Sequence, residues 1–165
     1  MSEPASAAAA LAGPGRGILA ADESLRTVSA RLAAAGVAPT AANRRAYREM
    51  LVTTPGLAAG ISGVILGEEA FRQRLRDGRS FPAALADLGL MTGIRADAGA
   101  GPLAGTRGET ITEGLDGLLP RLREYAGLGA RFALWRAVLR IGPGIPSPLT
   151  ITRTAQVRIA PATPS

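Results

Sequence analysis

The chain contains four short apolar runs, and the segments between them show the spacing of apolar residues that is typical of helices. The runs are 17–22 (GILAAD), 61–66 (ISGVIL), 92–98 (TGIRADA) and 132–141 (FALWRAVLRI). Each run is nearly continuous in apolar residues, which is typical of a strand covered on both faces. Strands that alternate with helices in this way predict parallel pairing through helical crossovers.

Capping residues and glycines mark where the first helices begin and end. Ser24 can cap a helix that presents Leu25, Val28 and Leu32 on one side and stops at Gly36. A second helix is predicted over 40–52. Its expected apolar side is formed by Tyr47, Met50 and Leu51, and its expected wetter positions are Arg44, Arg45 and Arg48.

The later helices are shorter, and one of them contains a proline. A turn or two of helix should follow Glu69, and Ser80 should begin another helix with Leu85 and Leu88 pointing inward. A further helix is predicted over 112–126. Pro120 lies inside it, so we expect a kink or an early end there, because an interior proline removes one hydrogen bond.

The pattern predicts one folded domain with two extensions. Residues 1–15 form a helix or a tail, 16–150 form the α/β domain, and the Pro- and Thr-rich segment 151–165 is predicted to be disordered. No basic flank precedes a long apolar stretch, so we expect neither export nor a membrane span and place the chain in the cytoplasm.

The composition removes several kinds of chemistry. All 19 basic residues are Arg, and the sequence contains no Lys, Cys or His. It therefore offers no thiol nucleophile, no imidazole base, no ordinary zinc site and no lysine that could form an imine. We expect no metal and no cofactor. The net charge of +6 could attract nucleic acid, but the arginines are dispersed among Ala and Glu, which argues against that partner.

Five segments in order carry a resemblance to a known family. They are 17–24 (GILAADES), 43–48 (NRRAYR), 61–69 (ISGVILGEE), 102–117 (PLAGTRGETITEGLDG) and 132–142 (FALWRAVLRIG). Together they resemble the class I, lysine-dependent fructose-bisphosphate aldolases over about residues 11–157. The resemblance implies the amino-terminal half of a (β/α)8 barrel, with four parallel strands and an incomplete barrel. In that family the imine-forming lysine and the proton-shuttling glutamates belong to the other half.

The resemblance also implies site residues. Asp22 matches the family's aspartate at the end of the first strand, which assists carbon–carbon cleavage, and Arg31 and Arg136 match arginines that line the site. Arg95 and Leu134 stand where the family has lysines, as does Arg140. An apolar Leu134 cannot bind a phosphate oxygen. We therefore expect this chain alone to be catalytically inactive, with weak binding of a phosphorylated sugar through Arg31, Arg95 and Arg136.

A simpler interpretation competes with each of these roles. Asp22 could be an ion-pair partner of Arg95 or Arg136 without a chemical role. The arginines could balance Asp22, Asp97, Glu68 and Glu69 without binding phosphate. Glu68 and Glu69 are adjacent, so on a strand they would point to opposite faces and could not act on one substrate.

Partners and alternative functions stay open at this stage. An incomplete barrel exposes two sheet edges, which predicts self-association, pairing with a complementary half-barrel, or a loosely folded and aggregating chain. The alternative functions are a non-enzymatic Arg-rich module that binds nucleic acid or an acidic partner, and a remnant without a function.

Overall fold

The structure, a computed structural model, describes residues 3–155. The chain divides into two compact units: Met1–Arg95 with Leu122–Leu134, and Ala96–Arg121 with Trp135–Ser165. No helix in the described part of the chain is both long and apolar enough to cross a membrane.

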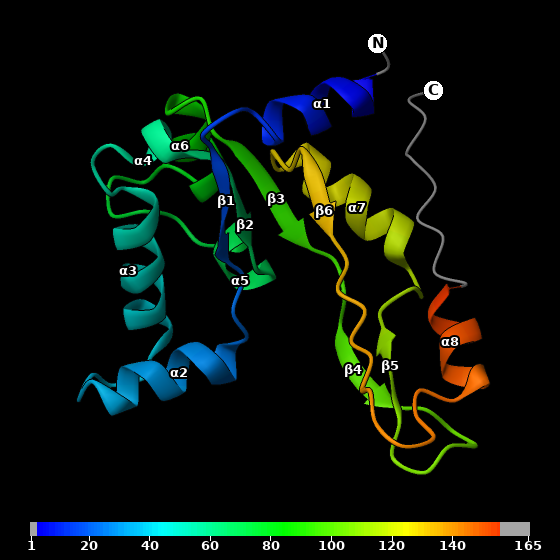
Figure 1. Ribbon diagram of the computed structural model, residues 1–165. Helices are drawn as coiled ribbons and strands as arrows, with labels where there is room; N and C mark the ends of the chain where they lie inside the picture. Colours follow the sequence, from blue (N-terminus) through cyan, green and yellow to red (C-terminus); the bar gives the residue numbers. More distant parts are fainter. Residues whose placement is uncertain (1–2, 156–165) are drawn as a thin grey trace. The chain divides into compact units, whose positions relative to one another are not determined.

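A parallel four-stranded sheet organises the first unit (Figure 1). Its strands are β1 (Gly17–Ala21), β2 (Ile61–Leu66), β3 (Met91–Arg95) and β6 (Phe132–Leu134), in the spatial order β1-β2-β3-β6. All three neighbouring pairs are parallel. The sequence prediction of four parallel strands joined by helical crossovers is confirmed.

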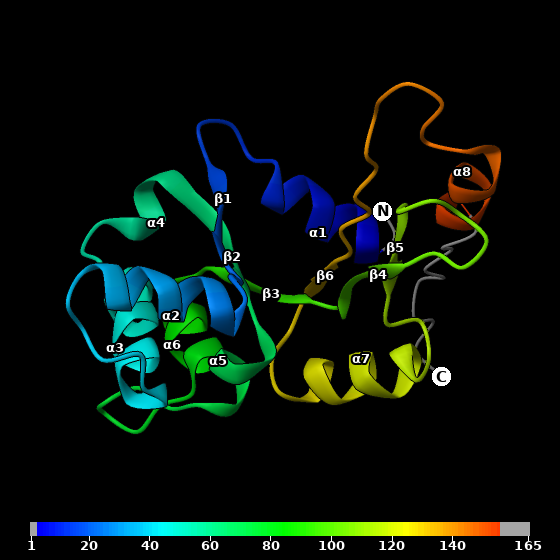
Figure 2. The same ribbon diagram turned by 90° about the horizontal axis from the view of Figure 1, so that it is seen from below.

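Three helices of this unit begin at the capping residues that the sequence indicates, whereas α4 (Leu57–Gly60) was not predicted. The other helices of the unit are α1 (Glu3–Leu11), α2 (Leu25–Ala34), α3 (Ala41–Val52), α5 (Glu68–Arg72) and α6 (Phe81–Asp87); α7 (Leu118–Gly127) starts in the second unit and ends in the first. Ser24, Thr40 and Ser80 cap α2, α3 and α6, each accepting from a backbone N–H three residues ahead at 3.1–3.2 Å. In Figure 2, α2, α3, α5 and α6 lie on one side of the sheet and α1 lies on the other.

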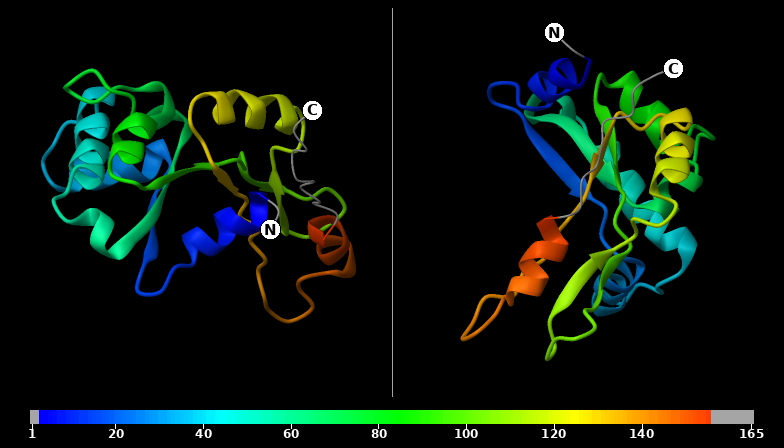
Figure 3. Two further views of the ribbon diagram at one scale, coloured as in Figure 1. Left: turned by 90° about the horizontal axis from the view of Figure 1, so that it is seen from above. Right: turned by 90° about the vertical axis from the view of Figure 1, so that its right-hand side faces the viewer.

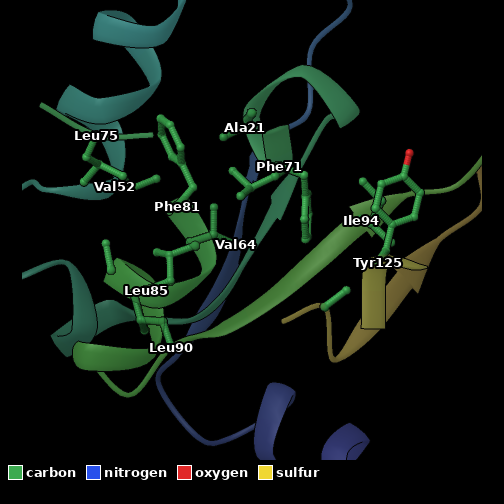
Figure 4. Packing of buried hydrophobic residues seen from close by; sticks show 14 residues of the cluster. Ala21, Val52, Val64, Phe71, Leu75, Phe81, Leu85, Leu90, Ile94 and Tyr125 are labelled. Atoms are coloured by element: carbon green, nitrogen blue, oxygen red, sulfur yellow. The ribbon is translucent and has the colours of Figure 1, made fainter. Parts of the chain in front are cut away.

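The hydrophobic core of the unit fills the space between the sheet and its helices (Figure 4). Val64, Leu66 and Ile94 contribute from the strands, and Phe81 and Leu85 contribute from α6. Rings from α5 and α7 meet at the side of this core, where Phe71 and Tyr125 pack edge to face with centroids 5.5 Å apart. Residues of β1, β2 and β3 pack in this way against residues of α3, α5, α6 and α7, which cover one face of the sheet.

The opposite face of the sheet is shaped by two glycines. A Cβ on Gly93 would lie 2.3 Å from the ring of Phe132, and a Cβ on Gly63 would lie 2.7 Å from Leu11 and 3.3 Å from Phe132. The ring of Phe132 therefore lies across β3 and β2, and Leu11 at the end of α1 packs beside it. Only residues without a side chain permit this close approach.

The second unit contains an antiparallel hairpin and a helix. Strands β4 (Gly99–Pro102) and β5 (Thr110–Glu113) pair with each other, and α8 (Pro148–Ala155) contacts β5. Figure 3 shows α8 in orange and red near the green hairpin. Glu109 connects the parts, because its carboxylate accepts from the backbone N–H of Ser147 at 2.8 Å, just before α8 begins.

The predicted helix over 112–126 is wrong in its first half. Residues Thr110–Glu113 form strand β5, and helix α7 begins only at Leu118. Pro120 is consequently the third residue of α7, where the backbone N–H has no partner within the helix in any case. Pro120 causes no kink, because it lies in the first turn.

Two predicted strands are shorter than their apolar runs. The third was predicted to reach 98 but ends at Arg95, where the chain turns and Asp97 Oδ1 accepts from Gly99 N at 3.1 Å. The fourth was predicted to reach 141 but ends at Leu134, which is paired with Arg95. Because β3 stops there, β6 has no neighbour with which to continue.

Three side-chain orientations and one segment also differ from prediction. Leu88 is 44% exposed because it lies at the end of α6, and Met50 is 58% exposed. Arg48, expected on the wet side of its helix, is buried against Glu69. Residues 151–155, predicted to be disordered, complete α8, because Ser147 caps this helix by accepting from Thr150 N. The rest of that predicted tail lies outside the described residues.

Candidate ligand site at the carboxyl edge of the sheet

The candidate site residues of the first unit follow the carboxyl ends of its strands. Asp22 and Glu23 come directly after β1, Glu68 and Glu69 open α5 after β2, and Arg95 is the last residue of β3. The strands are parallel, so their carboxyl ends meet at one edge of the sheet. In (β/α)8 barrels this edge carries the functional groups.

Asp22 and Arg95 are in direct contact. The Arg95 guanidinium donates from Nη1 to the main-chain carbonyl oxygen of Asp22 at 2.7 Å, and thereby ties β3 to the end of β1 across β2. Asp22 is almost fully buried, at 4% exposure. The Nε of Arg95 is also buried and has no hydrogen-bond partner among the described residues.

Arg31 reaches the same edge through an ion pair. It lies in the last turn of α2, and its guanidinium donates to Glu23 Oε1 and, at 3.4 Å, to the hydroxyl of Tyr47. These partners raise the pKa of Arg31, the Tyr47 hydroxyl most and Glu23 next. The other oxygen of Glu23, Oε2, is buried and finds no hydrogen-bond partner within residues 3–155.

Two arginines from α3 hold Glu69. Arg44 donates from Nε and Nη2 to both carboxylate oxygens at 2.7–3.2 Å, and Arg48 donates from Nη1 to Oε2. Hydrogen bonds from Arg44, followed by those from Arg48, lower the pKa of the Glu69 carboxyl against the opposing effect of desolvation. Glu69, Arg44 and Arg48 form the Glu69 cluster. This cluster attaches the turn between β2 and α5 to α3, and its hydrogen bonds favour the ionised form of Glu69.

A depression of about 350 Å³ lies at this edge, and of the predicted binding residues Arg95 lines it, whereas Asp22 and Arg31 do not. Its lining is Glu23, Leu25, Arg48, Gly67, Glu68, Glu69, Arg72 and Arg95. Glu68 points along α5 and pairs with Arg72, so Glu68 and Glu69 have different partners and do not form an acid–base pair. Guanidinium groups that are held by carboxylates in this way leave N–H donors suited to phosphate oxygens.

The fourth predicted residue, Arg136, belongs to the second unit. Its backbone N–H donates to Asp97 Oδ2 at 3.3 Å, and its carbonyl oxygen accepts from the hydroxyl of Thr112 at 2.8 Å. It follows the end of β6 by two residues. The structure thus brings Asp22 and Arg95 together, links Arg31 to them through Glu23, and describes Arg136 within the other unit.

Sequence reasoning missed the parts played by Glu23, Arg44 and Arg48. A signal existed, because Arg44 and Arg48 are four residues apart and lie on one face of a helix, and two glutamates follow the neighbouring strand. Only the packing of α3 against α5 shows that this face turns inward. Within residues 3–155, no three acidic side chains gather as ligands for a metal ion.

Comparison with known proteins agrees with this arrangement. The family model described as "Fructose-bisphosphate aldolase class-I" matches residues 3–162. A probable fructose-bisphosphate aldolase class 1 of Xanthomonas campestris is 53% identical over 151 residues, which cover 92% of this chain and 45% of that protein. The cytoplasmic isozyme of fructose-bisphosphate aldolase from Spinacia oleracea is 52% identical, with 88% and 41% covered.

A solved structure agrees as well. The fructose-bisphosphate aldolase of Plasmodium falciparum, crystallised with TRAP and a small-molecule inhibitor, matches with a TM-score of 0.87 and 42% identity. The match covers 90% of this chain and 44% of that one, so the chain spans a little under half the length of the relatives it matches. The four-stranded parallel sheet with its helices is a partial (β/α)8 barrel, and the chain belongs to the class I fructose-bisphosphate aldolase family.

Proposed function

We propose that these 165 residues bind a phosphorylated sugar at the carboxyl edge of the sheet and do not by themselves cleave it. The proposal takes its ligand class from the family, whose members are named for fructose bisphosphate. Arg95 and Arg31 supply guanidinium donors for phosphate oxygens, and Asp22 is the retained carboxylate at the end of β1. Arg136, which belongs to the second unit, stays a prediction of the family resemblance.

The proposal that the chain does not cleave the sugar rests on the absence of lysine from the sequence. Cleavage by the family's route needs a side-chain amine that attacks the ketose carbonyl and then holds the product as a protonated imine. Guanidinium groups keep their proton and cannot attack a carbonyl. Leu134, at the end of β6, adds an apolar group where the family has an active-site lysine.

Calorimetric titration with fructose 1,6-bisphosphate tests the binding. We expect millimolar or tighter affinity that weakens about tenfold or more in Arg95→Ala, because one charge-assisted phosphate contact is lost. Arg123→Ala is the matched control, since this exposed arginine of α7 lies outside the depression. Absence of heat at millimolar ligand, or equal losses in both variants, would overturn the binding proposal.

Borohydride reduction in the presence of the same ligand tests the chemistry separately. We expect no ligand-derived mass on any side chain. Leu134→Lys restores an amine at the end of β6, and should strengthen binding without producing turnover, because the family's imine-forming lysine has no counterpart here. A covalent adduct on a side chain of the unaltered chain would refute the proposal of inactivity.

The cellular location of the chain also remains a proposal. Several relatives carry cytoplasmic or cytosolic names, as in Spinacia oleracea and Arabidopsis thaliana. The sugar phosphates that such enzymes act on carry a charge that keeps them in the aqueous compartment in which they are made. These points support a cytoplasmic location.

A further inference from the structure

We infer, on the basis of the proposed function, that Arg48 binds a phosphate group of the sugar ligand together with Arg95. Both arginines line the depression at the carboxyl edge of the sheet, whereas Arg31 does not. The sequence pattern placed Arg48 on the wet side of α3, and the family resemblance gives it no role. Its position in the structure makes it a second cation of the ligand site.

Arg48 is a buried cation with an unused hydrogen-bond donor. Its side chain is 1% exposed, and its Nη1 atom donates to Glu69 Oε2. Its Nε atom is buried and has no hydrogen-bond partner among the described residues. An unpaired buried donor costs free energy, and an acceptor that enters the depression would remove this cost.

Glu69, the carboxylate that Arg48 contacts, is already shared with Arg44. It accepts two hydrogen bonds from Arg44 Nε and one from Arg44 Nη2, at 2.7–3.2 Å, and a fourth from Arg48 Nη1. A carboxylate has about four lone-pair sites, so Glu69 has none left for Arg48 Nε. Two arginines here face one negative charge. The Glu69 cluster therefore carries an excess positive charge, which an anion would neutralise.

The other two arginines of the lining have different surroundings. Arg72 is half exposed and pairs with both Glu68 and Glu124, so carboxylates already neutralise its charge. Arg95 donates from Nη1 to a main-chain carbonyl oxygen, and its Nε atom is buried without a partner within residues 3–155. Arg48 and Arg95 are thus the lining residues whose guanidinium groups have unused buried donors.

The unpaired atoms of the lining fit a phosphorylated sugar. Glu23 Oε2 is a third buried atom of this lining that lacks a partner in the described part of the chain. A carboxylate oxygen only accepts, so it requires a donor from the ligand. Phosphate oxygens can accept from Arg48 and Arg95, and a sugar hydroxyl can donate to Glu23. The depression of about 350 Å³ is large enough for a small molecule of this class.

Calorimetric titration of Arg48 variants with fructose 1,6-bisphosphate is the first test. We expect Arg48→Met to weaken binding about tenfold or more, because one charge-assisted contact to phosphate is lost. Arg48→Lys keeps the charge but loses the planar set of donors, so it should recover only part of the loss. Arg45→Met is the matched control, because Arg45 lies on the same helix, pairs with Glu49 and does not line the depression.

A variant that tightens binding distinguishes a lost contact from a lost fold. Glu69→Gln removes the negative charge that Arg44 and Arg48 share, so the excess positive charge at the depression rises. We expect the dissociation constant of the bisphosphate to fall severalfold, which a folding defect cannot produce. Glu124→Gln removes an exposed negative charge outside the lining and should leave the constant unchanged.

The double variant assigns this gain to one arginine. In the chain with both Arg48→Met and Glu69→Gln, the tighter binding should disappear, because the cation that gains from the loss of Glu69 is gone. Titration with unphosphorylated fructose should show no difference between the unaltered chain and Arg48→Met. A loss with fructose equal to that with the bisphosphate would overturn the assignment of Arg48 to a phosphate group.

The outcomes separate the role of Arg48 from the proposed function itself. Absence of heat from the unaltered chain at millimolar bisphosphate overturns both. If the unaltered chain binds and Arg95→Ala weakens binding, but Arg48→Met binds as tightly as Arg45→Met, only the role of Arg48 is overturned. If Arg48→Met does not fold, Glu69→Gln decides: an unchanged or raised dissociation constant overturns the role of Arg48 and leaves the proposed function standing.

Discussion

At the scale of single residues, Gly93 leaves no room for a side chain. The ring of Phe132 occupies the space of its absent Cβ, at 2.3 Å. We expect Gly93→Ala to lower the free energy of unfolding by about 1–3 kcal/mol, because the ring must leave its position over β3. Urea denaturation followed by circular dichroism measures this change.

A second glycine provides the matched control for that residue. At Gly127, the last residue of α7, a Cβ would meet no described atom within 4 Å apart from its chain neighbours and the backbone of its own helix. Gly127→Ala should be neutral or should stabilise the chain by up to about 1 kcal/mol, since alanine favours the helix. The change Phe132→Leu should recover part of the loss in Gly93→Ala. Equal effects of the two glycine changes would mean that Phe132 does not lie where the structure places it.

At the scale of elements, Glu69 fastens α3 to the turn between β2 and α5. Replacement of Glu69 by Gln removes the negative charge that pairs with Arg44 and Arg48. Arg48 is only 1% exposed, so water cannot replace this charge. We expect Glu69→Gln to cost about 2 kcal/mol of unfolding free energy, because a buried guanidinium loses its counter-charge. Denaturation by urea at pH 7 is the measurement.

The adjacent glutamate shows what an exposed pair contributes. Glu68 pairs with Arg72, and both side chains are at least half exposed. Glu68→Gln should change the stability by less than about 0.5 kcal/mol, because solvent screens such a pair. If the two substitutions have similar effects, the Glu69 cluster does not hold α3 in place.

The elements also show how far the sequence determines the fold. The capping residues Ser24, Thr40 and Ser80 correctly predict the starts of three helices. The apolar runs that begin at Gly17 and Ile61 form strands as predicted. Local capping and apolar patterning are sufficient to determine these elements. Strand β6 ends where its partner β3 ends. The residues 132–141 themselves contain no pattern that predicts this end point. The hairpin β4–β5 is short and rich in glycine, so its pairing is decided by contacts distant in sequence.

The candidate site was predictable only in part, for the same reason. Asp22 and Arg95 follow strand ends, so their proximity follows from parallel pairing once the strands are known. The burial of Arg48 depends on which face of α3 turns toward α5, and helical periodicity with Tyr47 and Met50 indicated the wrong face. Hydrophobic patterning cannot predict that Arg48 is buried, because the carboxylate that pairs with it belongs to Glu69, 21 residues away in the sequence.

At the scale of the whole molecule, each of the two compact units contains a carboxylate whose pKa is lowered by its contacts. Hydrogen bonds from Arg44 and then Arg48 lower the pKa of Glu69 in the first unit, and donors at Ser147 lower that of Glu109 in the second. Such a group stabilises the folded state above its pKa in the unfolded chain. That contribution is lost as the pH falls from about 4.5 through the lower pKa of the folded state.

Acid titration should therefore weaken both units, and separate probes can distinguish them. Trp135 is the only tryptophan in the sequence and belongs to the second unit, so its fluorescence reports on that unit. Helical circular dichroism reports mainly on the first, which holds α2 to α6. We expect Glu109→Gln to reduce the pH dependence of the fluorescence transition, and Glu69→Gln to reduce that of the dichroism transition. If either variant moves both transitions equally, the two units unfold as one cooperative body, and the division into two would be wrong in energetic terms.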